Sequence, residues 1–452
     1  MSQARRATLT ASVTLWLVVG ALPASAHGLG GRADLPIPLG LFLGGAAVVL
    51  ILSFAALAVL WPAHRWQTDP PMRALTVPGF RGALTALRIV GVGVLALIIA
   101  TGVFGVNNPS RNPAPVLLWI GFWLVVPFLS AMFGDLYRFA NPFPTLARWL
   151  RLGGEEQPDF LVSTGMYPAA GVLLAFVWVE TVYPDPASPR TVAIMALVYL
   201  VAMLVSIERL GPATTLGAVD GFSVYNRLIS RIAPFTRTEG GDPAWRGWLR
   251  GLSTLPELPG LALFLVVMVG TVTYDGISDT PWFRDLSGDF GSTIPGGTVL
   301  LVVTVGLIGI GYGGACLAAA RIAGDGWTAE RVADRFAHTL VPIALAYAVA
   351  HYFTLILFEG QRIISSMSDP FGTGIDLFGT SDRAIDFGLI SPTGVWYVQL
   401  TVIVAGHVAA VFLAHDRALF DFPSDVAVKT QYAMLALMVV LTGVGLAILA
   451  AG

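Results

Sequence analysis

Two histidines and a nearby glutamate lie in long apolar stretches of this sequence, where ionisable side chains are costly and usually functional. His351 falls in "AYAVAHYFTLILFEGQ" and His407 in "TVIVAGHVAAVFLAH". On a helix, Glu359 returns to nearly the same face as His351 about two turns, or roughly 12 Å, further along. Tyr347 lies one turn before His351 on this face. We therefore expect a polar stripe that leads out of the membrane interior.

Two more carboxylates, those of Asp275 and Glu180, lie at the ends of other apolar stretches and could converge on the mouth of this stripe. Imidazole and carboxylate groups suit zinc and other divalent ions, and a metal ion with an open position can activate water. We predict His351, Glu359 and Asp275 as catalytic residues. We predict His351 and His407 as ligands of a divalent metal ion, Zn or Cu. The alternative for each histidine is a buried hydrogen bond between helices.

A third predicted metal ligand is His27, which directly follows "LPASA". Arg5 and Arg6, the apolar run "LTASVTLWLVVGAL" and the small residues of "ASA" form the pattern of a secretory signal peptide. This pattern predicts a signal peptide over residues 1–26 and a mature chain that begins at His27. The α-amine and the imidazole of His27 could then chelate copper together. The alternative is that His27 follows the cleavage site by chance.

The composition is that of a polytopic membrane protein, because 55% of the residues are hydrophobic and only 12% are charged. Ten apolar stretches are long enough to cross about 30 Å of hydrocarbon. We predict an all-α fold: a polytopic integral membrane bundle of about ten transmembrane helices after a cleaved signal peptide, with short interfacial helices and an ordered external loop cap. The bundle would form one domain over residues 27–452. The predicted spans are 38–61, 86–106, 114–134, 161–182, 190–207, 259–274, 296–320, 337–358, 394–414 and 428–450.

Basic residues are distributed unequally between the two sets of loops that join these spans. If the mature N-terminus lies outside, 17 arginine and lysine residues fall on the cytoplasmic side and six on the opposite side. The positive-inside rule favours this orientation. We therefore predict a multi-pass protein of the plasma membrane, with its mature N-terminus and its C-terminus outside and a cytoplasmic loop over residues 208–258.

Two loops on the predicted external side, residues 275–295 and 359–393, are acidic and rich in Gly, Ser and Pro. Long loops in a compact protein are usually functional or disordered. Aromatic residues such as Trp282 and Phe378 favour an ordered cap over the helix ends. The alternative is a pair of solvated acidic linkers.

Two stretches on the predicted cytoplasmic side resemble each other: "FGDLYRFANPFPTLARWL" at 133–150 and "VDGFSVYNRLISRIAPF" at 219–235. In each stretch an Asp precedes an aromatic residue, and Tyr, Arg and a Pro-Phe pair follow. We expect short basic amphipathic helices that lie at the membrane surface. Their likeness reflects either an internal duplication or the ordinary chemistry of interfacial helices.

Several functional motifs are missing from the sequence. It contains no G-x-x-x-x-G-K-[ST] phosphate loop, no G-x-S-x-G elbow, no H-E-x-x-H helix and no C-x-x-C-H haem site. Cys316 is the only cysteine, which excludes a disulfide framework within one chain. We expect no nucleic-acid partner.

The order of segments resembles a family of bacterial polytopic proteins that is labelled fenitrothion hydrolase. The likeness extends over nearly the whole mature chain. It rests on "AHGLGGRADLPIPLGLF", "FGDLYRFANPF", "FSVYNRLISRIAPF", "MVGTVTYDGIS", "HTLVPIALAYAVAHYFTLILFEGQ" and "GHVAAVFLAHDRAL". The resemblance implies a membrane hydrolase that cleaves organophosphorus triesters, although some members of the family are labelled transporter permease.

Three functions therefore remain open at this point. A hydrolase would act on a lipophilic small molecule with a hydroxide that a metal ion activates at the His/carboxylate site. A membrane transporter or metal-handling protein would use His351 and His407 near the membrane midplane. A subunit of a membrane complex would use its external cap to dock a second membrane protein.

Overall fold

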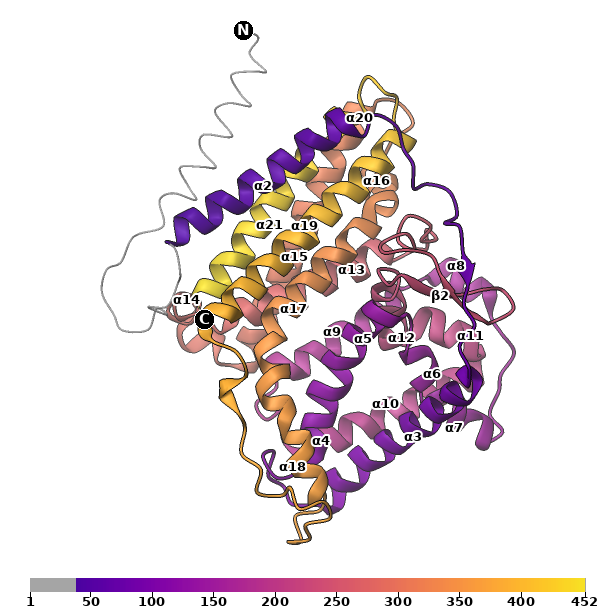
Figure 1. Ribbon diagram of the computed structural model, residues 1–452, viewed down its shortest axis with the longest axis vertical. Coiled ribbons are helices and arrows are strands. Elements are labelled where there is room, and N and C mark those ends of the chain that lie inside the picture. Colours follow the sequence, from indigo (N-terminus) through magenta and orange to yellow (C-terminus); the bar gives the residue numbers. More distant parts are fainter. Residues whose placement is uncertain (1–37, 452) are drawn as a thin grey trace. The chain divides into compact units, whose positions relative to one another are not determined.

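Long apolar helices make up nearly all of the regular structure in residues 38–451, the part of the chain that the computed structural model describes (Figure 1). The predicted signal peptide over residues 1–26 and the predicted metal ligand His27 lie outside these residues. Within the described part, nine helical segments are long and apolar enough to cross a membrane, and the number is ten if two further helices, with a bend of 69° between them, form one crossing. The predicted all-α polytopic bundle is therefore confirmed. The chain is a multi-pass membrane protein, and its surroundings are a lipid bilayer.

The crossing segments of the described part are single helices, runs of short helices, or the bent pair. The single helices are α2 (Leu39–Leu60), α3 (Phe80–Phe104), α10 (Pro189–Leu210), α13 (Leu261–Ser278), α15 (Ile294–Ala323) and α19 (Pro392–Asp421). One run consists of α4 (Pro113–Pro115), the π-helix η1 (Val116–Val125) and α5 (Val126–Phe133). A second consists of α16 (Ala329–Phe336), η3 (Ala337–Thr339), α17 (Leu340–Phe358), η4 (Glu359–Gln361) and α18 (Arg362–Ser368), and a third of α20 (Ala427–Thr430) and α21 (Tyr432–Ala451). The bent pair is α8 (Pro158–Thr164) and α9 (Tyr167–Thr181).

Shorter elements connect these segments. The short helices are α6 (Tyr137–Ala140), α7 (Phe143–Trp149), α11 (Pro212–Thr214), η2 (Thr215–Val219), α12 (Gly221–Ile229), α14 (Pro281–Gly291) and η5 (Phe387–Leu389). The strands are β1 (Arg73–Ala74), β2 (Phe235–Arg237) and β3 (Pro243–Trp245), which form one antiparallel sheet in the order β1-β3-β2. Trp245 is paired with Arg73 on one side and with Phe235 on the other. The sheet thus ties the segment before α3 to the segment after α12.

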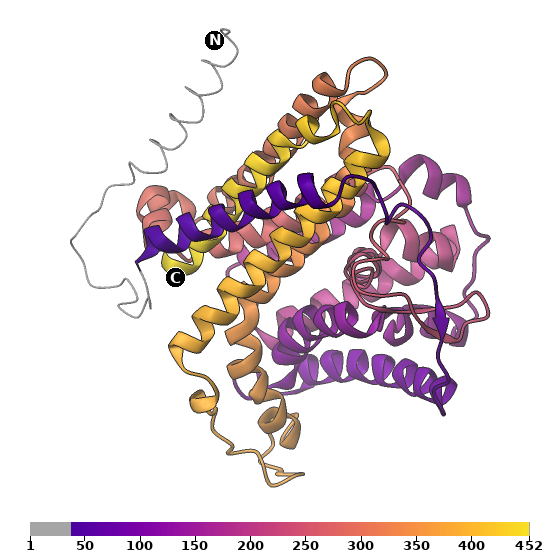
Figure 2. The same ribbon diagram turned by 45° about the horizontal axis from the view of Figure 1, so that its top comes forward.

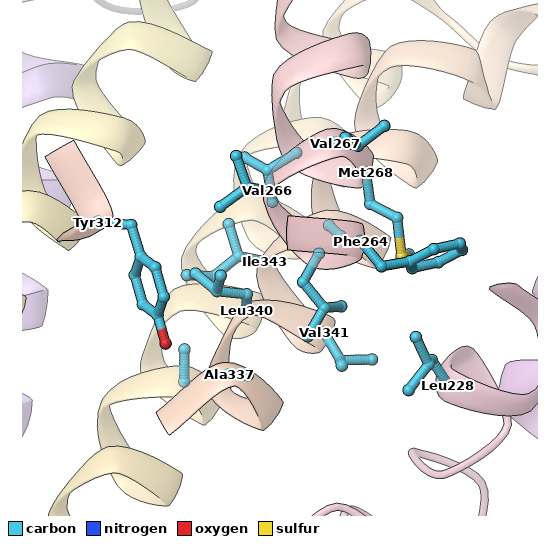
Figure 3. Close-up of a cluster of buried hydrophobic side chains, with 14 of the residues drawn as sticks. Leu228, Phe264, Val266, Val267, Met268, Tyr312, Ala337, Leu340, Val341 and Ile343 are labelled. Carbon is cyan, nitrogen blue, oxygen red and sulfur yellow. The ribbon is translucent and has the colours of Figure 1, made fainter. Parts of the chain in front are cut away.

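Helix α13 forms the centre of the bundle. In its most apolar window 72% of the residues are buried inside the protein, against 11% in the corresponding window of α3. A helix that is apolar on all sides is stable only when protein or lipid surrounds it completely. Protein surrounds α13, whose Phe264, Val266 and Met268 lie in a cluster with Leu340 and Ile343 from α17 (Figure 3). Along most of α3, lipid surrounds the helix instead of protein.

Helices α2, α19 and α21 lie side by side in both views of the molecule (Figures 1 and 2). Helix α19 also packs closely against α17, and Gly406 makes this approach possible. A Cβ atom on Gly406 would lie 2.3 Å from the Cβ of Ala346 and 2.8 Å from the carbonyl oxygen of Pro342. Small residues at such crossings allow membrane helices to gain packing energy at short range. The contact fixes the position of α17, which carries His351.

Helix α12 does not lie at the surface as the sequence pattern suggested. Most of its residues are buried, among them Phe222, Tyr225 and Leu228, and the helix packs against α5, α9 and α17. Asp220 forms its N-cap by accepting hydrogen bonds from the backbone N–H groups of Phe222 and Ser223, each at 3.1 Å. The interfacial interpretation of residues 219–235 is therefore wrong for α12. The physical reason is that its aromatic and aliphatic face packs against other helices of the protein and not against lipid.

The predicted external loops contain short ordered elements. Residues 275–295 include α14, and residues 359–393 include η4, α18 and η5. In the second loop Asp369 accepts hydrogen bonds from the backbone N–H groups of Thr373 and Gly374 at 2.9 and 2.8 Å. These bonds close a turn in the manner typical of aspartate.

Candidate functional site

The candidate site is centred on the carboxylate of Asp275, which lies near the end of α13. Nε2 of His351 is 2.8 Å from Oδ2 of Asp275, and the hydroxyl of Tyr352 donates a hydrogen bond to the same oxygen at 2.7 Å. His351 and Tyr352 are consecutive residues of α17. The side chains of His351 and Asp275 keep 22% and 19% of their surface exposed. The pair is therefore shielded, but water still reaches it from one side.

A second carboxylate, that of Glu180, lies beside this pair. Glu180 is close to the end of α9, within electrostatic reach of both Asp275 and Tyr352. Its Oε2 atom is buried and has no hydrogen-bond partner among the described residues. Tyr225 of α12 approaches Glu180 from a third side. A buried carboxylate oxygen without a protein partner is uncommon, which sets Glu180 apart from the structural carboxylates of the described residues.

Trp123 completes the surroundings of Glu180. Its indole Nε1 is buried and also has no hydrogen-bond partner among residues 38–451, although it lies close to the glutamate. The ring centroids of Trp123 and Tyr225 are 5.1 Å apart. We call the whole group the Asp275 cluster, and its members are Trp123, Glu180, Tyr225, Asp275, His351 and Tyr352.

The π-helix η1 determines where Trp123 points. In a π-helix each N–H bonds five residues back instead of four, and the N–H of Val126 accordingly donates to the carbonyl of Gly121. Pro127 follows directly and has no N–H to offer, which disturbs the regular ladder at this place. π-Helices are uncommon and are frequent at functional sites because the widened turn redirects side chains.

The Asp275 cluster contains no permanent cation. Among the salt bridges of the described residues, neither Asp275 nor Glu180 has an arginine or lysine partner. The nearby Arg284 pairs instead with Asp279 at 2.8 Å. Two carboxylates that share one imidazole in a poorly hydrated place cannot all ionise independently. The ionisable groups of the cluster therefore lie close enough to influence one another.

A small hollow lies next to His351. Its volume is about 10 Å³, and Tyr347, Gly276 and Ile403 are among the residues that line it. This is about the space that one water molecule needs. A larger groove of about 510 Å³ exists along residues 74–82, but none of the residues that line it belongs to the Asp275 cluster.

The structure brings together only part of the predicted site. His351 and Asp275 are in contact, whereas Glu359 forms an ion pair with Arg362 on the next turn. Nδ1 of His407 lies 2.9 Å from the carbonyl oxygen of Ile403, and its Nε2 is buried without a partner among the described residues. His407 is thus buried, and its hydrogen bond lies within its own helix and not between helices as in the alternative. No group of three or more potential metal ligands occurs within residues 38–451, so that the residues present do not fit a metal centre of three or more ligands.

Tyr352, Trp123 and Tyr225 were not expected at the site from the sequence. A signal existed for Tyr352, since it is adjacent to His351 in an apolar stretch. No signal existed for Trp123 and Tyr225, because their positions depend on the π-helix and on the burial of α12.

No family model, curated protein or solved structure matches this chain in the comparisons with known proteins.

Proposed function

We propose that this chain is a membrane transport protein that carries protons through the Asp275 cluster. One observation supports the proposal above all: Asp275 accepts hydrogen bonds from a histidine and a tyrosine, beside a second buried carboxylate and without a permanent cation, inside a membrane-spanning bundle. Ionisable groups in such a position commonly mark proton relays.

The chemistry of the cluster suits proton exchange. A proton that enters from the exposed side of the pair can reside on His351 Nε2 or on Asp275 Oδ2, which are 2.8 Å apart. Transfer between them breaks one N–H bond and forms one O–H bond, with no net change in charge of the pair. Glu180 lies within electrostatic reach of Asp275, so that the two carboxylates and the imidazole form one group of neighbouring proton-binding sites. A proton needs only a hydrogen-bond partner and a water molecule, which the small hollow next to His351 can hold.

Further polar groups lie beyond Glu180. Tyr225 is followed in α12 by Asn226, whose Oδ1 accepts a hydrogen bond from the hydroxyl of Ser130 at 3.2 Å. Asn226 and Ser130 are both buried. These two groups form a buried polar pair next to Tyr225 in the sequence of α12.

The test is proton flux in reconstituted vesicles. Purified protein in liposomes with a pH-sensitive dye inside receives an imposed pH gradient, while potassium and valinomycin clamp the membrane potential. We expect the wild type to dissipate the gradient and Asp275→Asn to slow this by about a hundredfold, because an amide cannot exchange a proton as a carboxylate does.

Asp279→Asn is the matched control, because Asp279 lies four residues further on in an exposed ion pair with Arg284. This variant should conduct as the wild type does. Equal flux in wild-type and protein-free vesicles, or an equal loss in both variants, would contradict the proposal.

Hydrolysis is the second candidate. A histidine oriented by a carboxylate is the arrangement of a general base with its orienting partner, as His351 and Asp275 are placed. The resemblance to fenitrothion hydrolases supports this reading. The hollow beside His351 is far smaller than the 300–1,000 Å³ of usual small-molecule sites, which favours proton transport. Turnover of an aryl phosphate triester that disappears in His351→Ala, while protein insertion is normal, would instead support the hydrolase.

A further inference from the structure

A group of arginines surrounds a single carboxylate at the junction of α5 and α6. Asp135 lies between these helices, within electrostatic reach of Arg138, Arg227 and Arg231. Arg246 lies close to Arg231. We call these four arginines, with Asp135, the arginine cluster. It lies outside the membrane-spanning segments, at the end of the bundle that the positive-inside rule places in the cytoplasm.

The two similar sequence stretches build this cluster by packing on each other. Asn141 of the first stretch donates hydrogen bonds to Asp220 Oδ2 and Ser223 Oγ of the second, at 2.8 and 3.0 Å. Gly134 turns the chain between α5 and Asp135 with a φ of 94°. This left-handed conformation strains any residue with a Cβ atom. The contacts fix the arginines of α12 beside the α5–α6 turn.

The hydrogen bonds of the cluster leave cationic charge without a partner. Arg227 donates to the carbonyl of Gly217 at 3.1 Å, and Arg246 donates to backbone carbonyls of α12 and the following turn. The guanidinium groups of Arg138 and Arg231 have neither a hydrogen bond nor an ion pair among the described residues. Asp135 is within electrostatic reach of Arg138, Arg227 and Arg231, and Asp220 is a second carboxylate near Arg227.

Burial makes this imbalance costly. Burial raises the pKa of Asp135, and the neighbouring arginines offset this rise only partly. The carboxyl group of Asp135 is therefore less readily ionised. Burial also lowers the pKa of Arg227 and Arg231. Cations that are withdrawn from water need an anion or hydrogen-bond acceptors to compensate for lost hydration. The described residues place two carboxylates, those of Asp135 and Asp220, near the four guanidinium groups, and Asp220 already accepts hydrogen bonds from Asn141, Tyr199 and Ser223.

An exposed row of aromatic side chains borders the cluster. The rings of Phe133 and Phe235 are stacked with centroids 6.5 Å apart, and the ring of Trp245 is 5.2 Å from that of Phe235. Phe133 and Trp245 are 53% and 41% exposed. Aromatic residues with this exposure are typical of the level of lipid headgroups. The cluster therefore opens where the phosphate groups of a bilayer lie.

We propose that the arginine cluster binds a phosphate group, which in the membrane belongs to the headgroup of an anionic phospholipid. Two free guanidinium groups can hold phosphate oxygens in forked, charge-assisted hydrogen bonds. Basic pockets between membrane helices on the cytoplasmic side bind anionic headgroups in this way. The inference is independent of the proposed proton transport.

The experiment measures lipid retention. Native mass spectrometry of the purified protein, mixed with equal amounts of phosphatidylglycerol and phosphatidylcholine, should show preferential retention of phosphatidylglycerol. Arg138→Gln and Arg231→Gln should each reduce this preference about fivefold. Arg321→Gln is the matched control, because Arg321 lies exposed in the last turn of α15 at the same end of the bundle, outside the cluster.

Two further measurements belong to the same experiment. Arg231→Lys keeps the charge but loses the fork, so that its retention should lie between those of wild type and Arg231→Gln. Millimolar inorganic phosphate should fail to displace the lipid. Equal retention of both lipids by the wild type, an equal loss in Arg321→Gln, or binding of inorganic phosphate in place of the lipid would overturn the proposal.

Discussion

At the scale of single residues, the buried carboxylates of this protein fall into two kinds. Asp416 is fully buried in α19 and accepts four hydrogen bonds, from Trp61 Nε1, the backbone N–H groups of Arg65 and Trp66, and Gln67 Nε2, at 2.7 to 3.1 Å. Such complete satisfaction is typical of a structural carboxylate. Glu180, with a buried oxygen that has no partner in the described part, contrasts with it.

We predict that Asp416→Asn destabilises the protein without altering proton flux in the protein that remains folded. An amide keeps one acceptor oxygen but places an N–H₂ group where two donors already point. Loss of a hydrogen bond to a charged group costs roughly 1.5–3 kcal/mol. Thermal unfolding in detergent should show the decrease. Asp425→Asn, on an exposed residue of the same region, should leave the unfolding temperature unchanged.

The residue pair at the site was only partly predictable from the sequence. His351 and Asp275 are 76 residues apart, and their encounter was expected because Asp275 lies at the end of its apolar stretch, where it could converge on the mouth of the polar stripe that carries His351. The eight-residue spacing predicted that Glu359 lies on the same helix face as His351. The carboxylate of Glu359 instead forms an ion pair with Arg362, one turn further along. Helix α19 is apolar on most sides, so that its sequence pattern does not determine which way His407 faces.

At the scale of elements, the length of the apolar stretches in the sequence predicted the membrane-crossing helices well. A stretch without charges must be buried in lipid or protein, whichever neighbours it has. The burial of α12 could not be predicted in this way, because arginines and aromatic residues alternate there as they do in an interfacial helix. Only the polar contacts of Asp220 and Asn141, on two different segments, fix it inside the bundle.

The segment that leads into α12 provides an element-scale prediction. Glu156 accepts hydrogen bonds from the backbone N–H groups of Ala213 and Thr214 at 2.8 and 2.9 Å, and so caps α11. Its slight burial would raise the pKa of its carboxyl group, but these hydrogen bonds outweigh that effect and lower the pKa below 4.5. A lowered carboxyl pKa in the folded state stabilises the protein above the unfolded value, and this contribution is lost as the pH falls below it.

We therefore expect wild-type stability to decrease as the pH falls below about 4.5, in part through Glu156. Glu156→Gln should be less stable than the wild type at pH 7, with a difference that shrinks in acid. Thermal unfolding between pH 7 and pH 3 measures both effects. Glu155→Gln is the control, because Glu155 is exposed and has no hydrogen bond among the described residues. A constant difference between wild type and Glu156→Gln at all pH values would refute the assignment.

At the scale of the whole molecule, the sequence predicts the orientation in the membrane from its arginines. The single native cysteine, Cys316, is buried, which makes the wild-type chain a suitable background for cysteine labelling. We predict that a membrane-impermeant maleimide labels Asp285→Cys in intact cells and labels Glu239→Cys only after the cells are opened. Asp285 lies in the acidic loop at α14, and Glu239 lies between β2 and β3.

Both positions are exposed, so that a difference in labelling reports the side of the membrane and not burial. The wild type should stay unlabelled in both preparations. Labelling of Glu239→Cys alone in intact cells would reverse the predicted orientation. It would also place the arginine cluster on the external side and remove the reason to expect an anionic leaflet there.

The π-helix η1 has a consequence for how this protein can vary. Each residue of an ordinary helix adds about 100° of rotation. Loss or gain of a single residue between Val116 and Val125 would therefore swing Trp123 away from Glu180 and turn Pro127 and the rest of α5 with it. Substitutions within this stretch can be absorbed one side chain at a time. We expect related proteins to tolerate amino-acid substitutions in this segment but to keep its number of residues constant.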